Sequence, residues 1–115
     1  MHLLDSDTAS FVPEFGALAS RWEQLAGLGH LPFGAMWCRV EPGGATHQDQ
    51  HPERELITVA RGAGTVRTTS GDLAVEAGQS VLLDSEEAHV ITNHSRTDPL
   101  VLLSIYWPPE PGERR

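Results

Sequence analysis

Histidines and acids crowd one short stretch, HQDQHPERE, which begins at His47 and ends at Glu55. Imidazole nitrogens and carboxylate oxygens together suit zinc and the other first-row divalent ions. If the first half of this stretch is extended, alternation along the backbone places His47, Asp49 and His51 on one face. Glu55 follows a proline and can face the same cavity if the chain bends there. The stretch therefore predicts a set of metal ligands, with a solvated loop as the alternative.

A second histidine signal lies about forty residues further along the chain. In the segment HVITN, alternation places His89, Ile91 and Asn93 on one face. A chance cluster in a loop would not come with such a distant partner, so the pair of segments favours metal binding. Asn93 is more typical of a turn or a hydrogen-bonding position than of a ligand.

The spacing of these residues follows two patterns. The first consists of Gly43, five residues, Asp49, one residue, His51, three residues, Glu55, six residues and Gly62. The second consists of Gly78, five residues, Asp84, one residue, Glu86, two residues, His89, three residues and Asn93. Together they resemble the two signatures of the cupin superfamily in the family's order. The chain departs from these signatures at three positions, because cupins have histidine at Asp49, proline at Asp84 and glycine at Glu86.

The resemblance implies a single cupin-type double-stranded β-helix, or jelly-roll barrel, with a divalent metal in its mouth. His51, Glu55 and His89 stand where cupins place three of their four metal ligands. The fourth ligand is Asp49, which occupies the family's histidine position, or His47, which a small shift or bulge could present instead. Zinc and ferrous iron lead the candidate metals, followed by manganese, nickel and copper. Glu55 or Asp49, when not bound to the metal, could serve as a general base.

The rest of the sequence predicts an all-β domain. Short apolar segments alternate with turn residues, as expected for an antiparallel sandwich or barrel, and cover residues 33–41, 55–62, 65–69, 73–77, 80–84, 89–93 and 99–107. The segment SRWEQLAG, residues 20–27, has glutamate three places after serine, the capping-box spacing, and predicts a short helix. We therefore expect an irregular or helical N-terminal extension over 1–30, the barrel over 31–108 and a flexible tail over 109–115.

Composition limits the partners. The chain has 115 residues, with 16 acids against 8 lysines and arginines and a net charge of −8. Such a charge disfavours nucleic acid and anionic membranes as partners. No spanning apolar run and no secretory signal are apparent, so we expect a cytoplasmic protein. The single cysteine, Cys38, lies in an apolar run and is expected to pack in the core.

Two hypotheses about function follow. The first is a small metal-dependent enzyme that acts on a small organic substrate, as a cyclase, isomerase or oxygenase of accessory or secondary metabolism. The second is a non-catalytic module that binds a metal or small ligand, since the departures at Asp49, Asp84 and Glu86 could mark a relaxed site. In one variant of it the chain assists a synthetase, because similar cupin domains occur fused to methionyl-tRNA-synthetase-like enzymes that form nitrogen–nitrogen bonds. We also expect a homodimer, formed through the first 30 residues and the apolar segment 99–107.

Overall fold

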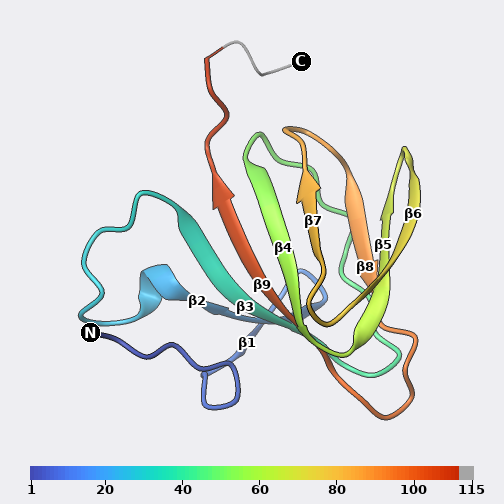
Figure 1. The fold of residues 1–115 in the computed structure, drawn as a ribbon, viewed down its shortest axis with the longest axis horizontal. Helices are drawn as coiled ribbons and strands as arrows, with labels where there is room; N and C mark the ends of the chain where they lie inside the picture. Colours follow the sequence, from blue (N-terminus) through green and yellow to red (C-terminus); the bar gives the residue numbers. More distant parts are fainter. Residues whose placement is uncertain (112–115) are drawn as a thin grey trace.

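The computed structural model describes residues 1–111, which form nine β-strands and one 3-10 turn (Figure 1). Six strands form one antiparallel sheet in the order β1-β2-β3-β9-β4-β7, and three form a second in the order β6-β5-β8. The elements are β1 (Val12–Glu14), β2 (Ala17–Arg21), η1 (Trp22–Gln24), β3 (Gly34–Val40), β4 (Arg54–Arg61), β5 (Ala63–Thr68), β6 (Gly71–Glu76), β7 (Ser80–Leu83), β8 (His89–Thr92) and β9 (Leu100–Trp107).

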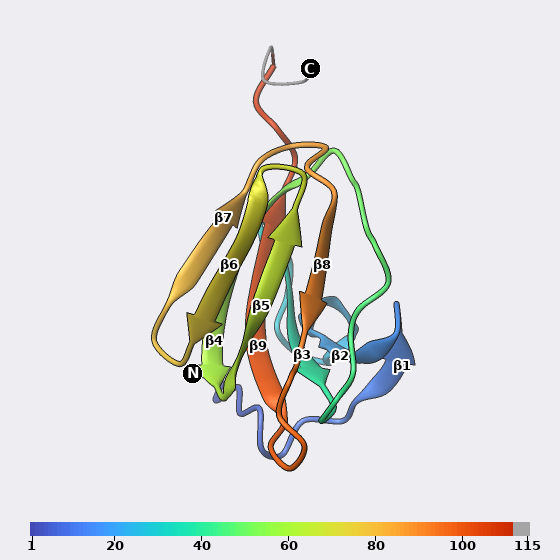
Figure 2. The ribbon, with the colours of Figure 1, turned by 90° about the vertical axis from the view of Figure 1, so that its right-hand side faces the viewer.

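The two sheets face each other, with β6, β5 and β8 in front of β4, β9 and β3 (Figure 2). This is the double-stranded β-helix that the sequence predicts, and each of the seven segments expected to be strands overlaps one. The segment 41–53 runs beside β8 without forming a regular strand, and isolated bridges join Ala45 to Thr92 and Asp49 to His89. These bridges hold the segment of the first cupin-like pattern against β8, which belongs to the second.

Alternating apolar residues from both sheets form the core. Its most completely buried large side chains include Val40, Ile57, Val66, Leu83, Leu100 and Leu102. Cys38 belongs to the same cluster, as expected. Asn93 is 1% exposed and donates hydrogen bonds through its side-chain amide to the carbonyls of Val40 and Asp98. It therefore has the hydrogen-bonding role that was expected of it, in a turn that closes the barrel.

The predicted helix over residues 20–27 is wrong. Ser20 and Arg21 end β2, where they pair with Trp37 and Met36 of β3, and only Trp22–Gln24 form one 3-10 turn. The carboxylate of Glu23 accepts a hydrogen bond from the backbone N–H of Ala35 and caps no helix. Pairing along a sheet edge thus overrides the local capping pattern. Within residues 1–111, no helix is long and apolar enough to cross a membrane.

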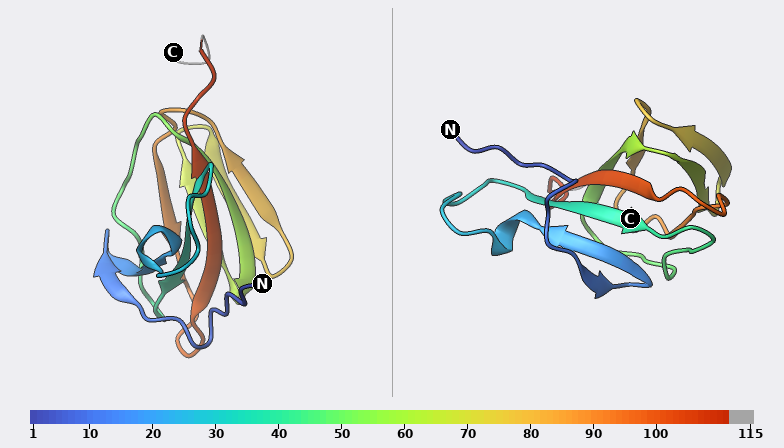
Figure 3. Two further views of the ribbon diagram at one scale, coloured as in Figure 1. Left: turned by 90° about the vertical axis from the view of Figure 1, so that its left-hand side faces the viewer. Right: turned by 90° about the horizontal axis from the view of Figure 1, so that it is seen from below.

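The first thirty residues add two strands to the larger sheet. The β1–β2 hairpin turns through Phe15 and Gly16, whose φ angles are 40° and 82°. Two consecutive positive φ values are the mark of the tight turn that matches the twist of a two-stranded hairpin. The hairpin lies at the outer edge of the sheet, beside β3 (Figure 3). Of the tail predicted over 109–115, residues 112–115 lie outside the described residues.

Candidate metal centre

Two histidines present the same ring nitrogen to one point at the mouth of the barrel. The Nδ1 atom of His51 lies 3.0 Å from the carbonyl oxygen of Glu53, and that of His89 lies 2.9 Å from the carbonyl oxygen of Glu87. A carbonyl oxygen only accepts hydrogen bonds, so Nδ1 carries the proton in each neutral ring and Nε2 keeps its lone pair. Such backbone contacts fix the tautomer and orientation of histidines that bind metals.

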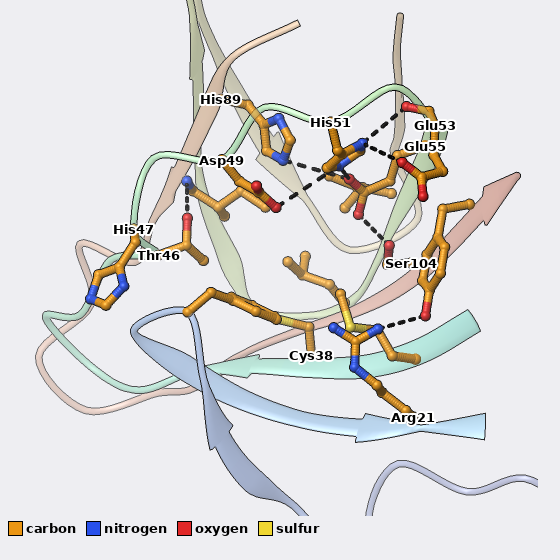
Figure 4. Close-up of a pocket in the computed structure, with 16 residues that line it drawn as sticks. Arg21, Cys38, Thr46, His47, Asp49, His51, Glu53, Glu55, His89 and Ser104 are labelled. Atoms are coloured by element: carbon orange, nitrogen blue, oxygen red, sulfur yellow. Dashed lines mark hydrogen bonds and ion pairs between the residues drawn. The ribbon is translucent and has the colours of Figure 1, made fainter. Parts of the chain in front are cut away.

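Glu55, from β4, lies between the two rings (Figure 4). Its Oε1 atom is 3.1 Å from Nε2 of His51 and 3.5 Å from Nε2 of His89. Two ligands bound at 2.0–2.2 Å to one ion lie about 3.0–3.5 Å apart, so these separations fit a shared cation. The second oxygen, Oε2, accepts a hydrogen bond from the hydroxyl of Ser104. Glu55 is 6% exposed, so its carboxylate is held from both sides inside the protein.

Asp49 completes the cluster from the segment beside β8. Ligand atoms of Asp49, His51 and His89 lie within 4.8 Å of one another. The Oδ2 atom of Asp49 is 3.9 Å from Nε2 of His51, which is wider than the Glu55 contacts. Reciprocal hydrogen bonds between the backbones of Asp49 and His89, of 3.1 and 3.0 Å, fix the position of Asp49. The carboxylate itself is exposed at the mouth.

His47 is not part of this cluster. Its side chain lies apart from the other ligands and away from them (Figure 4). Its backbone N–H donates to the carbonyl of Phe15, and its ring lies so close to Gly16 that an added Cβ would be 2.8 Å from Cδ2. The β1–β2 hairpin therefore holds this residue to the side of the barrel. The structure brings together Asp49, His51, Glu55 and His89 and leaves His47 outside.

Electrostatics couple these groups. The hydrogen bond to Glu55 is the main cause that raises the pKa of His51 to about 9, against the effect of burial. Burial by itself raises the pKa of Glu55, but hydrogen bonds from His51 and Ser104, with the nearby His89, outweigh it and lower that pKa below its ordinary value. Glu55 is thus ionised at neutral pH. Without a metal, a proton on His51 occupies the position between the ligands.

The residues present fit a divalent cation. Two imidazoles and two carboxylates converge, with no thiolate among them, because burial raises the pKa of Cys38 to about 12 and keeps it protonated. Such a set suits zinc, ferrous iron, manganese, nickel and copper alike. The structure thus supports a metal site built on His51, His89 and Asp49, with Glu55 in contact with both rings, and leaves the metal's identity open.

The cluster stands at one end of a cavity of about 200 Å³. The walls between the sheets are apolar and consist of Phe15, Met36, Cys38, Ile57, Ile91 and Leu102. Arg21 lies on the side away from the metal ligands (Figure 4), and Tyr106 also lines the cavity. Burial is the main cause that raises the pKa of Tyr106 to about 12, so its hydroxyl is neutral. The cavity is therefore an apolar chamber with a polar group at each end.

Three residues at the site escaped the sequence reasoning. Ser104 is the one serine in the apolar run PLVLLSIYW. Its spacing of two residues from Leu102 and from Tyr106 is the signal that it faces inward with them. Arg21 lay in the segment predicted as a helix, so no signal placed it in the barrel. No motif in the sequence singled out Tyr106, which lines the cavity.

The two departures in the second pattern have different effects. Glu86 has a φ of 65°, a left-handed conformation in which a glycine would be relaxed, and its backbone N–H donates to the carbonyl of His51. The backbone thus keeps the shape that the family's glycine allows. Asp84 is exposed and lies 3.3 Å from the guanidinium of Arg54. Neither side chain belongs to the metal cluster.

Comparison with known proteins agrees with this geometry. The family model described as "Cupin domain" matches residues 36–106. The plu4264 protein from Photorhabdus luminescens is 28% identical, with a TM-score of 0.80 over 93% of this chain and 86% of that one. A Cupin 2 conserved barrel domain protein from Salinispora arenicola is 21% identical, with a TM-score of 0.81 over 93% and 88%. The polyketide cyclase RemF from Streptomyces resistomycificus is 18% identical, with a TM-score of 0.76 over 92% and 78%.

The matched segment 36–106 contains both patterns and every residue of the metal cluster. The two structures below 25% identity share the fold alone, so their activities do not transfer. Fold, ligand geometry and family model agree, and the chain belongs to the cupin family.

Proposed function

We propose that this protein is a metal-dependent enzyme that acts on a small organic substrate held in the barrel. The observation that carries the proposal is the convergence of His51, His89 and Glu55 on one point at the end of the cavity. Binding sites of enzymes are typically apolar chambers with a few convergent polar groups, and this cavity has that form. A divalent ion bound there supplies Lewis acidity and lowers the pKa of a bound water.

The chain's own residues divide the remaining tasks. Both oxygens of Glu55 are engaged, one by the histidine rings and one by Ser104, so Glu55 serves to bind the metal. Asp49 has the more exposed carboxylate and the longer contact with His51, which leaves it better placed to accept a proton from a substrate. Of the two candidate bases, Asp49 is therefore the one that we assign to acid–base chemistry, in states in which its carboxylate is not bound to the metal. Cyclisation, isomerisation and oxygenation all fit such a site.

The proposal is tested by the metal content and activity of a His51→Ala variant. The purified wild-type protein should carry close to one divalent ion per chain by elemental analysis, and His51→Ala should lose it. Activity, screened against cyclic and open-chain carbonyl compounds and phenols, should disappear with the metal. His94→Ala removes an exposed histidine outside the site and serves as the control. Unchanged metal content in His51→Ala would refute the assignment.

A non-catalytic binding module is the second candidate, and the position of Asp49 favours it. An exposed carboxylate 3.9 Å from its neighbour stands where the family's signature has histidine, which suits a site that binds weakly and exchanges its ligand. A module that assists a synthetase belongs to the same class. The number of exchangeable waters on bound manganese, measured by proton relaxation, distinguishes the two candidates. An enzyme requires at least one open position, whereas a closed shell indicates a module.

We also propose a homodimer. Strand β9 is paired on both sides, with β3 and β4, so the apolar segment that ends in Trp107 offers no free edge. The free edges of the larger sheet are β1 and β7. Of these two, β1 belongs to the N-terminal segment that we expect to supply the interface. Light scattering at micromolar concentration should give twice the mass of one chain. A monomer would contradict the proposal.

A further inference from the structure

Arg21 and Tyr106 form a second polar group in the cavity: Tyr106 pairs with Glu55 across β4 and β9, and Arg21 lies away from the metal ligands (Figure 4). Arg21 donates through Nη1 to the hydroxyl of Tyr106 at 2.7 Å, and that hydroxyl donates to Glu23 at 2.9 Å. The Nε and Nη2 atoms of Arg21 both donate to the carboxylate of Glu14, at 3.0 and 2.9 Å. We call Arg21 and Tyr106, with Glu14 and Glu23, the distal group. These hydrogen bonds fix the positions of Arg21 and Tyr106 relative to the two carboxylates.

The distal group still has hydrogen-bond donors to offer. A guanidinium has five N–H groups, and the contacts to Glu14 and Tyr106 occupy three of them. One hydrogen on Nη1 and one on Nη2 have no hydrogen-bond partner among residues 1–111, and Arg21 lines the cavity. The hydroxyl of Tyr106 already donates to Glu23. Arg21 is therefore the donor that a ligand oxygen can reach.

The charge of the cavity selects against anions. Its charged lining residues are Arg21 against Asp49, Glu53 and Glu55, which give a balance of −2. A divalent metal brings that balance only to zero. Arg21, the arginine among them, is in addition neutralised by its bidentate pair with Glu14 at 2.9 Å, and its Nη1 atom lies 4.0 Å from Oε2 of Glu23. An anionic ligand would thus meet no uncompensated positive charge, while an uncharged carbonyl or hydroxyl can accept from Arg21 without disturbing the pair.

The size and walls of the cavity limit the ligand further. Its volume of about 200 Å³ lies below the range of about 300–1,000 Å³ that is typical of pockets for drug-sized ligands. The apolar walls favour a compact ring or short branched skeleton. Glu14, Phe15, Arg21 and Glu23 all lie outside residues 36–106, the segment that the family model matches. The β1–β2 hairpin and η1 thus add three of the four residues of the distal group to a barrel that supplies Tyr106 and the metal ligands.

We infer that the substrate is a compact, uncharged and mainly apolar compound with two oxygens, one directed to the metal cluster and one accepting a hydrogen bond from Arg21. This inference rests on the proposed function and names the substrate class for the same site. Arg21 acts as a specificity residue, and Glu14 sets the charge that the cavity accepts.

Three one-ring probes test the inference by ligand-observed NMR titration of the zinc-loaded and metal-free protein. They are 1,4-diacetylbenzene, which is neutral with an oxygen at each end; acetophenone, which lacks the second oxygen; and 4-acetylbenzoate, which has the same size as the first but is anionic. The first should bind about three- to tenfold more tightly than acetophenone, the effect of one hydrogen bond. It should bind about tenfold more tightly than 4-acetylbenzoate.

Two variants locate the effect. Arg21→Met should abolish the advantage of 1,4-diacetylbenzene over acetophenone while zinc uptake persists. Glu14→Gln leaves Arg21 with only the more distant carboxylate of Glu23, at 4.0 Å, and should improve the binding of 4-acetylbenzoate about three- to tenfold, with little change for the neutral probes. A gain of this kind cannot come from misfolding.

Equal or tighter binding of 4-acetylbenzoate by the wild-type protein, an advantage for 1,4-diacetylbenzene that survives in Arg21→Met, or no binding of any probe at millimolar concentration would each overturn the inference. Zinc uptake is measured on the same samples. A protein that takes up no zinc contradicts the proposed function, whereas the comparison of 1,4-diacetylbenzene with acetophenone in the metal-free protein still decides the oxygen preference.

Discussion

Ser104 on β9 donates its hydroxyl hydrogen bond to Oε2 of Glu55 on β4, and the two residues are 2% and 6% exposed. The other oxygen of Glu55 faces both histidine rings. The hydrogen bond from Ser104 therefore occupies Oε2 of Glu55 and leaves Oε1 as the single atom that can bind a metal ion.

Removing this hydroxyl should weaken metal binding although Ser104 touches no metal. Ser104→Ala should lower zinc affinity about 10- to 100-fold, the usual cost of losing a group that orients a metal ligand. Ser104→Thr keeps the hydroxyl and should retain most of the affinity. Competition with a chromophoric chelator measures the effect. Equal affinity in Ser104→Ala would show that packing alone holds Glu55.

The two candidates for the fourth ligand should respond differently to truncation. Asp49→Ala should lower zinc affinity at least about tenfold, because its carboxylate lies in the cluster. His47→Ala should change it by less than about twofold, because the ring of His47 lies outside the cluster (Figure 4). The same titration serves for both, and each variant controls for the other. The reverse order would show that the segment beside β8 rearranges when metal binds.

Metal affinity should rise with pH. The metal-free protein holds the pKa of His51 at about 9, above its ordinary value of 6.5, so between these values His51 is protonated in the metal-free protein and must lose the proton to bind. The logarithm of zinc affinity should therefore increase by about one for each pH unit through this range and level off above pH 9. Calorimetry in buffers of different ionisation enthalpy should detect the released proton. A flat profile would contradict the coupling between His51 and Glu55.

The stability of the metal-free protein should depend on pH in the opposite sense. The pKa of His51 is raised on folding, so its contribution is fully present below pH 6.5 and is lost as the pH rises through about 9. The urea midpoint of the metal-free protein should fall over that range. His51→Gln should flatten the slope, since it removes the group that titrates. An unchanged slope in this variant would assign the effect elsewhere.

The distal group depends on a glycine on the neighbouring strand. Gly34 pairs with Tyr106 across β3 and β9, and an added Cβ would lie 2.0 Å from the tyrosine ring. Gly34→Ala should therefore displace the ring and destabilise the fold by about 1–3 kcal/mol, the usual cost of overpacking. In a Tyr106→Leu background the cost should be smaller, because the clashing ring is absent. Urea unfolding of the four proteins completes the cycle, and additive effects would argue against the clash.

A glycine at position 86 should stabilise the protein. Glu86 adopts a left-handed conformation at a φ of 65°, which strains a residue with a side chain. Glu86→Gly relieves this strain and should raise the free energy of unfolding by about 0.5–1 kcal/mol after the added freedom of the unfolded chain is subtracted. Glu87→Gly, at a position without that conformation, should lower it. Thermal unfolding of the metal-free variants checks both signs.

The sequence by itself determined the fold and most of the metal cluster. Alternating apolar residues and the turn residues between them predicted the strands from β3 to β9, because successive side chains of a strand point to opposite faces of the sheet. The spacing of His51, Glu55 and His89 predicted the ligands, because the two patterns occupy fixed places on the barrel. The local capping pattern at Ser20 predicted a helix that does not form. Pairing with β3 stabilises a strand there more than a capping box would stabilise a helix.

Only the tertiary structure decided how the cavity is completed. His47 and Asp49 share an alternation pattern, and a hydrogen bond from His47 to Phe15, thirty-two residues earlier in the chain, takes the first away from the site. Ser104 and Arg21 gain their roles from partners on other strands, Glu55 and Glu14. Spacing along one strand determines which face a side chain occupies, but what it meets there depends on strands that pair across the sheet. Such long-range contacts leave no local pattern in the sequence.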